Sequence, residues 1–164
     1  MQTLLTKGIR VVTIGPGEHH VGRGDEVIKT LLGSCVAVCL FDTVAGAGAM
    51  TLSLLASDRR KPNLNTARAG FYGASAMTLL LDAVLRRGAV RERLQAKVFG
   101  GANVLKSPLG RENNLYDIGN ANVDFALRFL ATARIPVIAQ DVRGTHGRVI
   151  HLDPADFSVF RNLI

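Results

Sequence analysis

The chain has 164 residues, of which 48% are hydrophobic and 20% are charged, and this is typical of one globular domain with a sizeable core. No apolar run approaches the length of about 18 residues that a membrane-spanning helix needs. Met1 to Gly17 also lacks the basic-then-apolar layout of a secretory signal. We therefore expect residues 1–164 to form a single domain that is not embedded in a membrane.

The formal net charge of +7 raises the question of a nucleic-acid partner. Basic residues gather in small groups at 59–61, 86–87 and 91–93, and basic proteins bind phosphate backbones without sequence preference. However, aromatic residues are only 5% of the chain and tryptophan is absent, and we find no zinc-finger spacing or RNA-binding aromatic motif. We expect a solvated basic surface and no nucleic acid; steeply salt-dependent DNA binding would indicate the alternative.

Residues 9–14 are predicted to form the first strand, which ends at the turn signal Gly15-Pro16-Gly17. His19 and His20 follow in what we interpret as a polar loop. An adjacent histidine pair can bind a metal, but no cysteine or carboxylate stands at ligand spacing from it. We therefore predict no metal site.

The segment Thr30 to Asp42 is the one that carries recognisable chemistry. Gly33 and Ser34 favour a turn, and the apolar, partly β-branched run from Val36 to Phe41 favours a buried strand. Cys35 falls where the turn meets the strand, so its thiol is fixed by the strand and opens toward whatever the turn faces. Backbone N–H groups of such a turn can also stabilise the oxyanion of an acyl-transfer reaction.

The second cysteine, Cys39, fits a packing role, because free cysteine is among the most buried residue types. It shares a strand face with Cys35 but lies about 13 Å further along, which is too far for a disulfide. Two unpaired cysteines, without a signal or a membrane span, indicate a cytoplasmic location.

The middle of the chain contains further elements. A strand over 50–55 is predicted to pair with the Cys35 strand, and 57–65 reads as an exposed loop. Apolar residues at three- and four-residue spacing predict an amphipathic helix over 66–87, which Gly88 ends. A strand over 97–99 opens into Gly100 and Gly101, where no phosphate-loop lysine follows, so the glycines indicate close backbone approach.

The C-terminal part completes an α+β domain. After a polar loop over 106–117, Asn120 or Asn122 is predicted to cap a helix that runs to about Arg134. Residues 135–142 are predicted to be a strand, with 148–152 as its hairpin partner across the turn 143–147, and 157–160 to be a last short strand. About eight strands and two helices indicate sheets whose outer faces the helices cover.

The sequence resembles the CheD family, the chemoreceptor glutamine deamidases of bacterial chemotaxis. The resemblance rests on blocks in family order that span nearly the whole chain: Thr30 to Asp42, Gly48 to Met50, Ala96 to Asn103, Ile118-Gly119 to Asn122-Val123, Ile135 to Val137, and Asp141-Val142 to Gly147-Arg148. It implies a mixed β-sandwich with external helices, similar to the catalytic domain of cytotoxic necrotizing factor toxins.

The resemblance also implies a function. CheD proteins convert glutamine side chains of methyl-accepting receptors to glutamates with release of ammonia. By this resemblance Cys35 is the nucleophile, Thr30 helps to position the site, and Gly100 and Gly101 shape the pocket beside the Gly33-Ser34 turn. The implied partners are chemoreceptor cytoplasmic domains and, where an organism has one, a CheC-type phosphatase; no cofactor is implied.

One position departs from the family pattern. CheD proteins have a catalytic histidine, which acts as base and then acid. Leu52 occupies its position in this chain. Leucine can neither raise the thiolate fraction of the cysteine nor supply a proton to departing ammonia. Four histidines are left as candidate substitutes, His19, His20, His146 and His151. The alternative function is a catalytically silent CheD-like protein that binds receptors or a CheC-type phosphatase without turnover.

Overall fold

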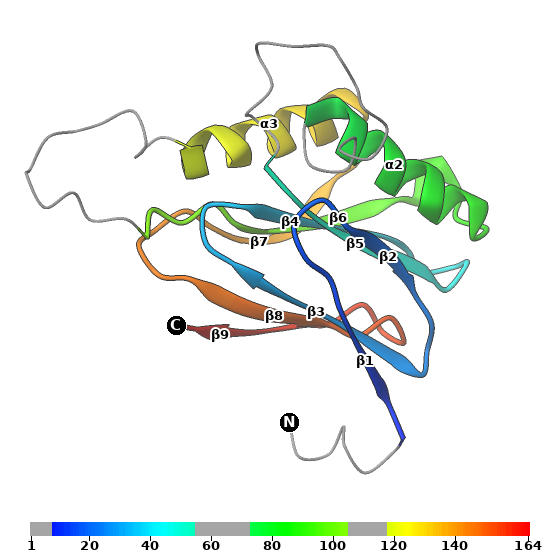
Figure 1. Ribbon diagram of the computed structural model, residues 1–164. Helices are drawn as coiled ribbons and strands as arrows, with labels where there is room; N and C mark the ends of the chain where they lie inside the picture. The colour runs from blue at the N-terminus through cyan, green and yellow to red at the C-terminus, as the bar shows by residue number, and fades with distance from the viewer. Residues whose placement is uncertain (1–7, 55–72, 105–117) are drawn as a thin grey trace, which may run out of the picture.

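The computed structural model describes residues 8–54, 73–104 and 118–164 and shows two β-sheets packed face to face (Figure 1). The four-stranded sheet has the order β1 (Arg10–Thr13), β3 (Glu26–Leu32), β8 (Arg148–Leu152), β9 (Val159–Leu163). The five-stranded sheet has the order β2 (His19–Gly22), β5 (Ala47–Ser53), β4 (Val36–Asp42), β6 (Gln95–Gly100), β7 (Val137–Val142).

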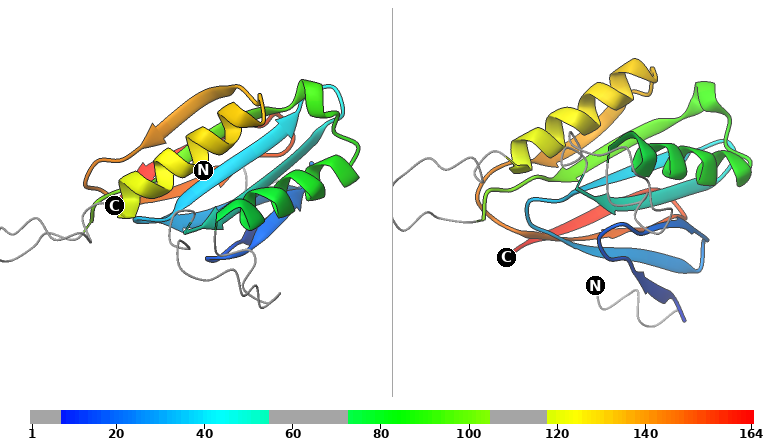
Figure 2. Two further views of the ribbon diagram at one scale, coloured as in Figure 1. Left: turned by 90° about the horizontal axis from the view of Figure 1, so that it is seen from above. Right: turned by 45° about the horizontal axis from the view of Figure 1, so that its top comes forward.

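Two α-helices complete this part of the chain, α2 (Gly73–Arg86) and α3 (Ile118–Thr132), with a short 3₁₀ helix, η2 (Arg91–Arg93). Both α-helices lie side by side on the outer face of the five-stranded sheet (Figure 2). The α+β class is therefore confirmed, and within the described ranges the helices cover one of the two outer sheet faces. Neither of them is long and apolar enough to span a membrane.

The strand β4 is the centre of the molecule, since every one of its seven residues is buried. Its side chains alternate between two apolar clusters. Val36, Val38 and Leu40 point toward the helices, whereas Ala37 and Cys39 point between the sheets. Because both faces of β4 are covered, its sequence is a continuous apolar run and not an alternating one.

The helices agree with the predicted periodicity but not with all predicted ends. The helix α2 buries Met77, Leu80 and Leu81 and stops before Gly88, whose φ of +100° favours glycine. Its predicted start at 66 lies outside the described residues, as do the predicted loops 57–65 and 106–117. The predicted cap of α3 is wrong, because the helix begins at Ile118 and Asn122 lies inside it, fully buried.

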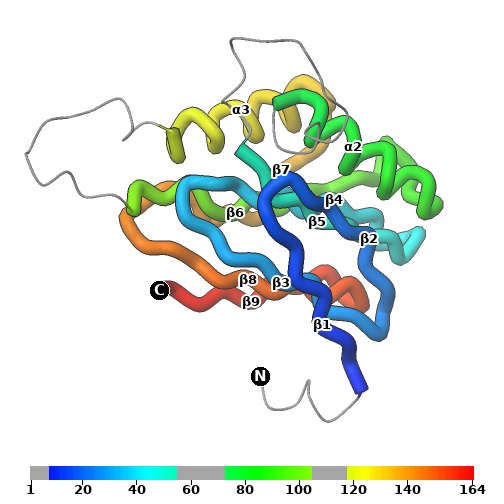
Figure 3. Tube along the Cα trace, in the orientation of Figure 1, coloured from blue at the N-terminus to red at the C-terminus, as the bar shows by residue number. Residues whose placement is uncertain are grey.

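The predicted hairpin between 135–142 and 148–152 is wrong. The strand β7 pairs in parallel with β6, after the α3 crossover, while β8 pairs with β3 and β9 in the other sheet. The connection 143–147 therefore carries the chain from one sheet to the other, at the same end as the β3–β4 turn (Figure 3). It turns at Arg143, whose φ of +69° lies in the left-handed region that favours glycine.

Two smaller predictions also need correction. His19 and His20 lie in β2, not in a loop, and pair with Thr51 and Met50 of β5. The last strand spans Val159–Leu163, two to three residues beyond its predicted place. In both cases short polar or mixed segments become strands because a neighbouring strand offers its backbone groups, which local sequence does not show.

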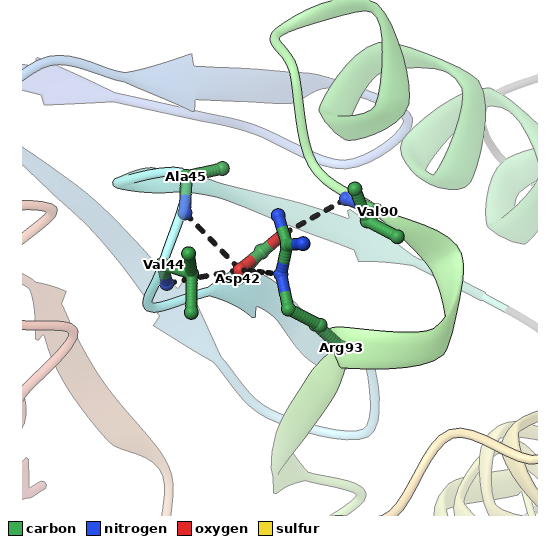
Figure 4. A network of polar contacts seen from close by, with 5 residues as sticks. All are labelled: Asp42, Val44, Ala45, Val90 and Arg93. Carbon is green, nitrogen blue, oxygen red and sulfur yellow. Dashed lines mark hydrogen bonds and ion pairs between the residues drawn. The ribbon is translucent and has the colours of Figure 1, made fainter.

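Asp42, at the end of β4, ties the centre of the sheet to the segment after α2 (Figure 4). Its carboxylate is inaccessible to solvent and accepts hydrogen bonds from the backbone N–H groups of Val44, Ala45 and Val90 at 2.8–3.2 Å. The Arg93 guanidinium forms an ion pair with it at 2.8 Å. This hydrogen bond from Arg93, with the backbone donors, holds the pKa of Asp42 well below its ordinary value.

We predict that Asp42→Ala lowers the free energy of unfolding by about 2–4 kcal/mol, because buried donors lose their acceptor. Urea unfolding at pH 7 measures this, with the exposed Asp82→Ala expected to change it by less than about 0.5 kcal/mol. A lowered pKa means that the contribution is complete above about pH 4 and is lost as the pH falls further. A difference between wild type and Asp42→Ala that grows below pH 4 would contradict this account.

Candidate functional site

Cys35 lies in the connection between β3 and β4, where the chain passes from the four-stranded to the five-stranded sheet. The residue is half-buried, and its side chain packs at the margin of the apolar cluster between the sheets. The predicted turn at Gly33 and Ser34 is present. Cys35 is therefore the less buried of the two cysteines, since Cys39 is completely buried.

The carbonyl groups of this turn are all engaged. Gly33 C=O accepts a hydrogen bond from Ala102 N–H at 2.9 Å, and Cys35 C=O accepts one from Gly101 N–H at 2.8 Å. Ser34 C=O accepts one from the side-chain Nδ2 of Asn122 at 2.9 Å. The loop after β6 and the first turns of α3 thus hold three successive peptide groups of the Cys35 turn, which is hereafter residues 33–35.

This arrangement fixes where the N–H groups point. The structure has no cis peptide bond among its described residues, and in a trans peptide the C=O of one residue and the N–H of the next point in opposite directions. The N–H of Ser34 therefore faces away from Ala102, and that of Cys35 faces away from Asn122. Both point to the side of the turn opposite these two partners, which is the side on which an oxyanion would accept from them.

Gly100 and Gly101 lie so close to the Cys35 turn and to α3 that neither position has room for a side chain. A Cβ added to Gly100 would lie 2.3 Å from the Cys35 carbonyl oxygen, and φ at Gly100 is +104°. A Cβ on Gly101 would lie 2.3 Å from Val123 Cγ2. The prediction of close backbone approach at the paired glycines is confirmed. Gly119 of α3 completes the contact, since its own Cβ would lie 2.5 Å from the Gly101 oxygen.

Burial governs the protonation of both cysteines. It raises the pKa of the Cys35 thiol above its ordinary value, with the residue's own backbone N–H acting in the opposite direction. Full burial raises the pKa of Cys39 to about 12, although the charge of Lys97 opposes this. The net effect of these surroundings is a Cys35 pKa above its ordinary value.

All four histidines lie in the described residues, and the strand pairings place three of them, His19, His20 and His151, away from Cys35. His20 is bonded to Glu26 at 2.8 Å, and this contact first of all lowers the Glu26 pKa to about 2. His20 lies opposite Met50 of β5, which in turn lies opposite Cys39 of β4. The spacings along and between strands place His20 about 16 Å from Cys35. His19 pairs with Thr51, on the opposite sheet face, and is exposed.

His151 and His146 belong to the C-terminal part. His151 pairs with Lys29 and Phe160, on the outer face of the four-stranded sheet, while Cys35 packs on the inner side. His146 is exposed in the segment 143–147, which touches the loop after β6 through Arg143 N–H to Gly100 C=O and Asn103 N–H to Gly144 C=O, each 2.8 Å. The segment that carries His146 therefore contacts residues adjoining those that hold the Cys35 turn.

Comparison with known proteins identifies the family. The family model described as CheD chemotactic sensory transduction matches residues 54–162. A Shewanella oneidensis protein named "Probable chemoreceptor glutamine deamidase CheD 2" is 56% identical over 155 residues, 94% of this chain and 77% of that protein. The chain belongs to the CheD family. The CheD family match itself begins after the Cys35 turn, whereas the Shewanella relative aligns over nearly the whole chain.

Other proteins are similar to this CheD chain to a lesser degree. A Geobacter sulfurreducens protein named "Probable chemoreceptor glutamine deamidase CheD 1" is 44% identical over 156 residues, 94% of this chain and 77% of that protein. Among solved structures, a Neisseria meningitidis protein of the DUF152 family has a TM-score of 0.43 at 11% identity, over 87% of this chain and 66% of that one.

Leu52, at the position that the resemblance assigns to the CheD histidine, lies in β5 next to the strand that begins after Cys35. It pairs with Ala37, two residues from Cys35 on the same sheet face, so it is a diagonal cross-strand neighbour of the cysteine. Its side chain is buried between the sheets beside Ala37 and Met50. A longer polar side chain at this position would reach toward the sulfur; leucine provides only packing.

Two residues of the site deserve separate placement. Thr30, in β3, is fully buried and its Oγ1 donates to the Ile14 carbonyl at 2.8 Å, which joins β3 to the segment after β1.

Asn122 was not predicted as a site residue. Its signal in the sequence is a polar residue on the inner face of an otherwise apolar helix, next to Val123, where burial requires a hydrogen-bond partner.

We predict that iodoacetamide modifies one thiol per folded chain. Cys35→Ser should abolish the modification and Cys39→Ser should leave it unchanged, because Cys39 is buried and its pKa is about 12. Because burial also raises the Cys35 pKa, the rate of Cys35 alkylation should continue to increase as the pH passes 9. Mass spectrometry of the intact protein counts the adducts, and equal labelling of both cysteines under native conditions would contradict the structure.

Proposed function

We propose that this CheD chain is a protein-glutamine deamidase that converts glutamine side chains of chemoreceptors to glutamates, with Cys35 as the nucleophile. The observation that carries the proposal is a half-buried thiol in a turn whose carbonyls are all held from one side. The names of its 56% and 44% identical relatives state the same activity and substrate.

The chemistry follows from the geometry of the turn. The sulfur of Cys35 attacks the side-chain amide carbon of glutamine, and the N–H groups of Ser34 and Cys35 stabilise the negative charge on the former carbonyl oxygen. The C–N bond then breaks, the nitrogen leaves as ammonia with the thiol proton, and a thioester remains. Water adds to the thioester, which releases glutamate and restores the thiol. No cofactor is needed for these steps.

The remaining site residues support this turn. Gly33 and Ser34 provide its backbone, and Gly100 and Gly101 allow the loop after β6 to approach it. Thr30 positions β3, which delivers the chain to Cys35. The substrate is the cytoplasmic part of methyl-accepting receptors, so the protein acts in the cytoplasm as one domain, with a CheC-type phosphatase as a further partner where present.

A second function is favoured by Leu52 and by the raised pKa of Cys35. A protein with little thiolate and no general acid at the sulfur can bind receptors or a CheC-type phosphatase without turnover. General acid-base assistance typically contributes about 10² to 10⁴-fold in rate. The two functions share a binding surface and differ only in whether the amide is hydrolysed.

We expect wild-type protein, incubated with a chemoreceptor cytoplasmic domain, to convert glutamine to glutamate at discrete sites. Peptide mass spectrometry detects the conversion, and Cys35→Ala should abolish it while leaving receptor binding intact. Cys39→Ala is the control, because that sulfur is sealed in the core. Identical receptor spectra for wild type and Cys35→Ala, with binding retained, would establish the silent binding protein instead.

We further expect Leu52→His to raise the deamidation rate, by up to about 10² to 10⁴-fold, because it restores a base diagonal to Cys35. Met50→His is the matched control. It introduces the same side chain on the same face of β5, but opposite Cys39, two residue pairs further from the sulfur. A similar rate change in both variants, or in neither while both remain folded, would show that position 52 does not serve the thiol.

A further inference from the structure

We infer that Asn122 is a positioning residue of the site, which sets the direction of the Cys35 N–H by holding the preceding carbonyl. This inference deepens the proposed function and rests on it for its effect on turnover. Its effect on the thiol itself is independent of any substrate. The juxtaposition that carries it is a buried amide of α3 bonded to the peptide group next to the nucleophile.

Asn122 is placed with little freedom. It is completely buried, and the helix that carries it meets the loop after β6 backbone to backbone, since any side chain at Gly119 or Gly101 would overlap the other segment. The amide therefore projects from a helix that cannot move closer to the loop after β6 without a clash. Ser34 C=O lies 2.9 Å from its Nδ2, a normal hydrogen-bond length.

The peptide group between Ser34 and Cys35 is the one whose orientation matters most. Its oxygen accepts the hydrogen bond from Asn122, and its nitrogen is the backbone N–H of Cys35 itself, which opposes the rise that burial causes in the pKa of the thiol. Because the peptide group is planar, one hydrogen bond to the oxygen fixes the direction of the hydrogen. Gly101 and Ala102 hold the flanking carbonyls, so only this central peptide depends on a side chain.

Losing the Asn122 amide has two expected consequences. The Ser34 carbonyl is left without this donor in a half-buried place, so the central peptide rotates toward another partner. The Cys35 N–H then no longer supports negative charge at the sulfur or on the substrate oxygen. A thiolate that loses such a hydrogen bond forms at higher pH, and a misplaced oxyanion donor slows the chemical step.

The test uses Asn122→Leu, which keeps the approximate size of the side chain without its donor, and Asn122→Ser as a smaller second variant in case leucine prevents folding. Asn120→Ala is the control. Asn120 lies in the same part of α3, but its Oδ1 accepts from Arg143 Nη1 at 2.7 Å and not from the Cys35 turn. Far-UV circular dichroism and thermal unfolding first establish which variants are folded at the assay temperature.

The first measurement is the rate of Cys35 alkylation by iodoacetamide as a function of pH. We expect the midpoint to rise by roughly one pH unit in the Asn122 variants, which lowers the rate near neutral pH about tenfold, and to stay unchanged in Asn120→Ala. The second measurement is receptor deamidation, where kcat should fall by about 10²-fold with little change in KM.

The outcomes separate the two proposals. Folded Asn122 variants with a lower thermal stability but the wild-type alkylation midpoint would show a merely structural role and overturn the inference. A shifted midpoint in a protein that never deamidates receptors would support the role of Asn122 and reject the proposed function. A shifted midpoint together with a reduced kcat supports both.

Discussion

The backbone of the Cys35 turn is held by hydrogen bonds to its carbonyl groups, and the rest of the site depends on this constraint. Turns at the ends of strands are usually free to adjust. Here the loop after β6 and Asn122 of α3 engage three successive carbonyls, and glycines at 100, 101 and 119 permit the contact. The helix α3 thus has a role beyond covering the apolar face of the five-stranded sheet, since its Asn122 reaches the Cys35 turn.

The sequence was sufficient for the parts of the site that depend on local chemistry. A Gly-Ser turn before a continuous apolar run placed Cys35 correctly at a strand entrance, and the paired glycines after β6 correctly indicated backbone contact. It was not sufficient where distant segments decide. The strands β7 and β8 each have an ordinary strand composition, so nothing local showed that they belong to different sheets. His19 and His20 became strand residues only because β5 lies beside them.

Asn122 and Leu52 illustrate the same limit in the site itself. Asparagine near the start of a helix favours a cap, and only the position of Ser34 across 88 residues of sequence gives it another partner. Leu52 could be recognised as a departure from the CheD pattern, but its place diagonal to Cys35 comes from the pairing of β4 with β5. In both cases the partner of the residue is set by strand pairing or by contacts between distant segments, which the local sequence does not show.

The half-buried position of Cys35 also bears on how fast peroxide oxidises its sulfur. Peroxide oxidises thiolates far faster than thiols, and oxidation beyond the sulfenic acid is generally irreversible. Because burial keeps the pKa of Cys35 above its ordinary value, the sulfur is almost entirely protonated at neutral pH. The same burial that lowers the thiolate fraction of Cys35 therefore also slows its reaction with peroxide.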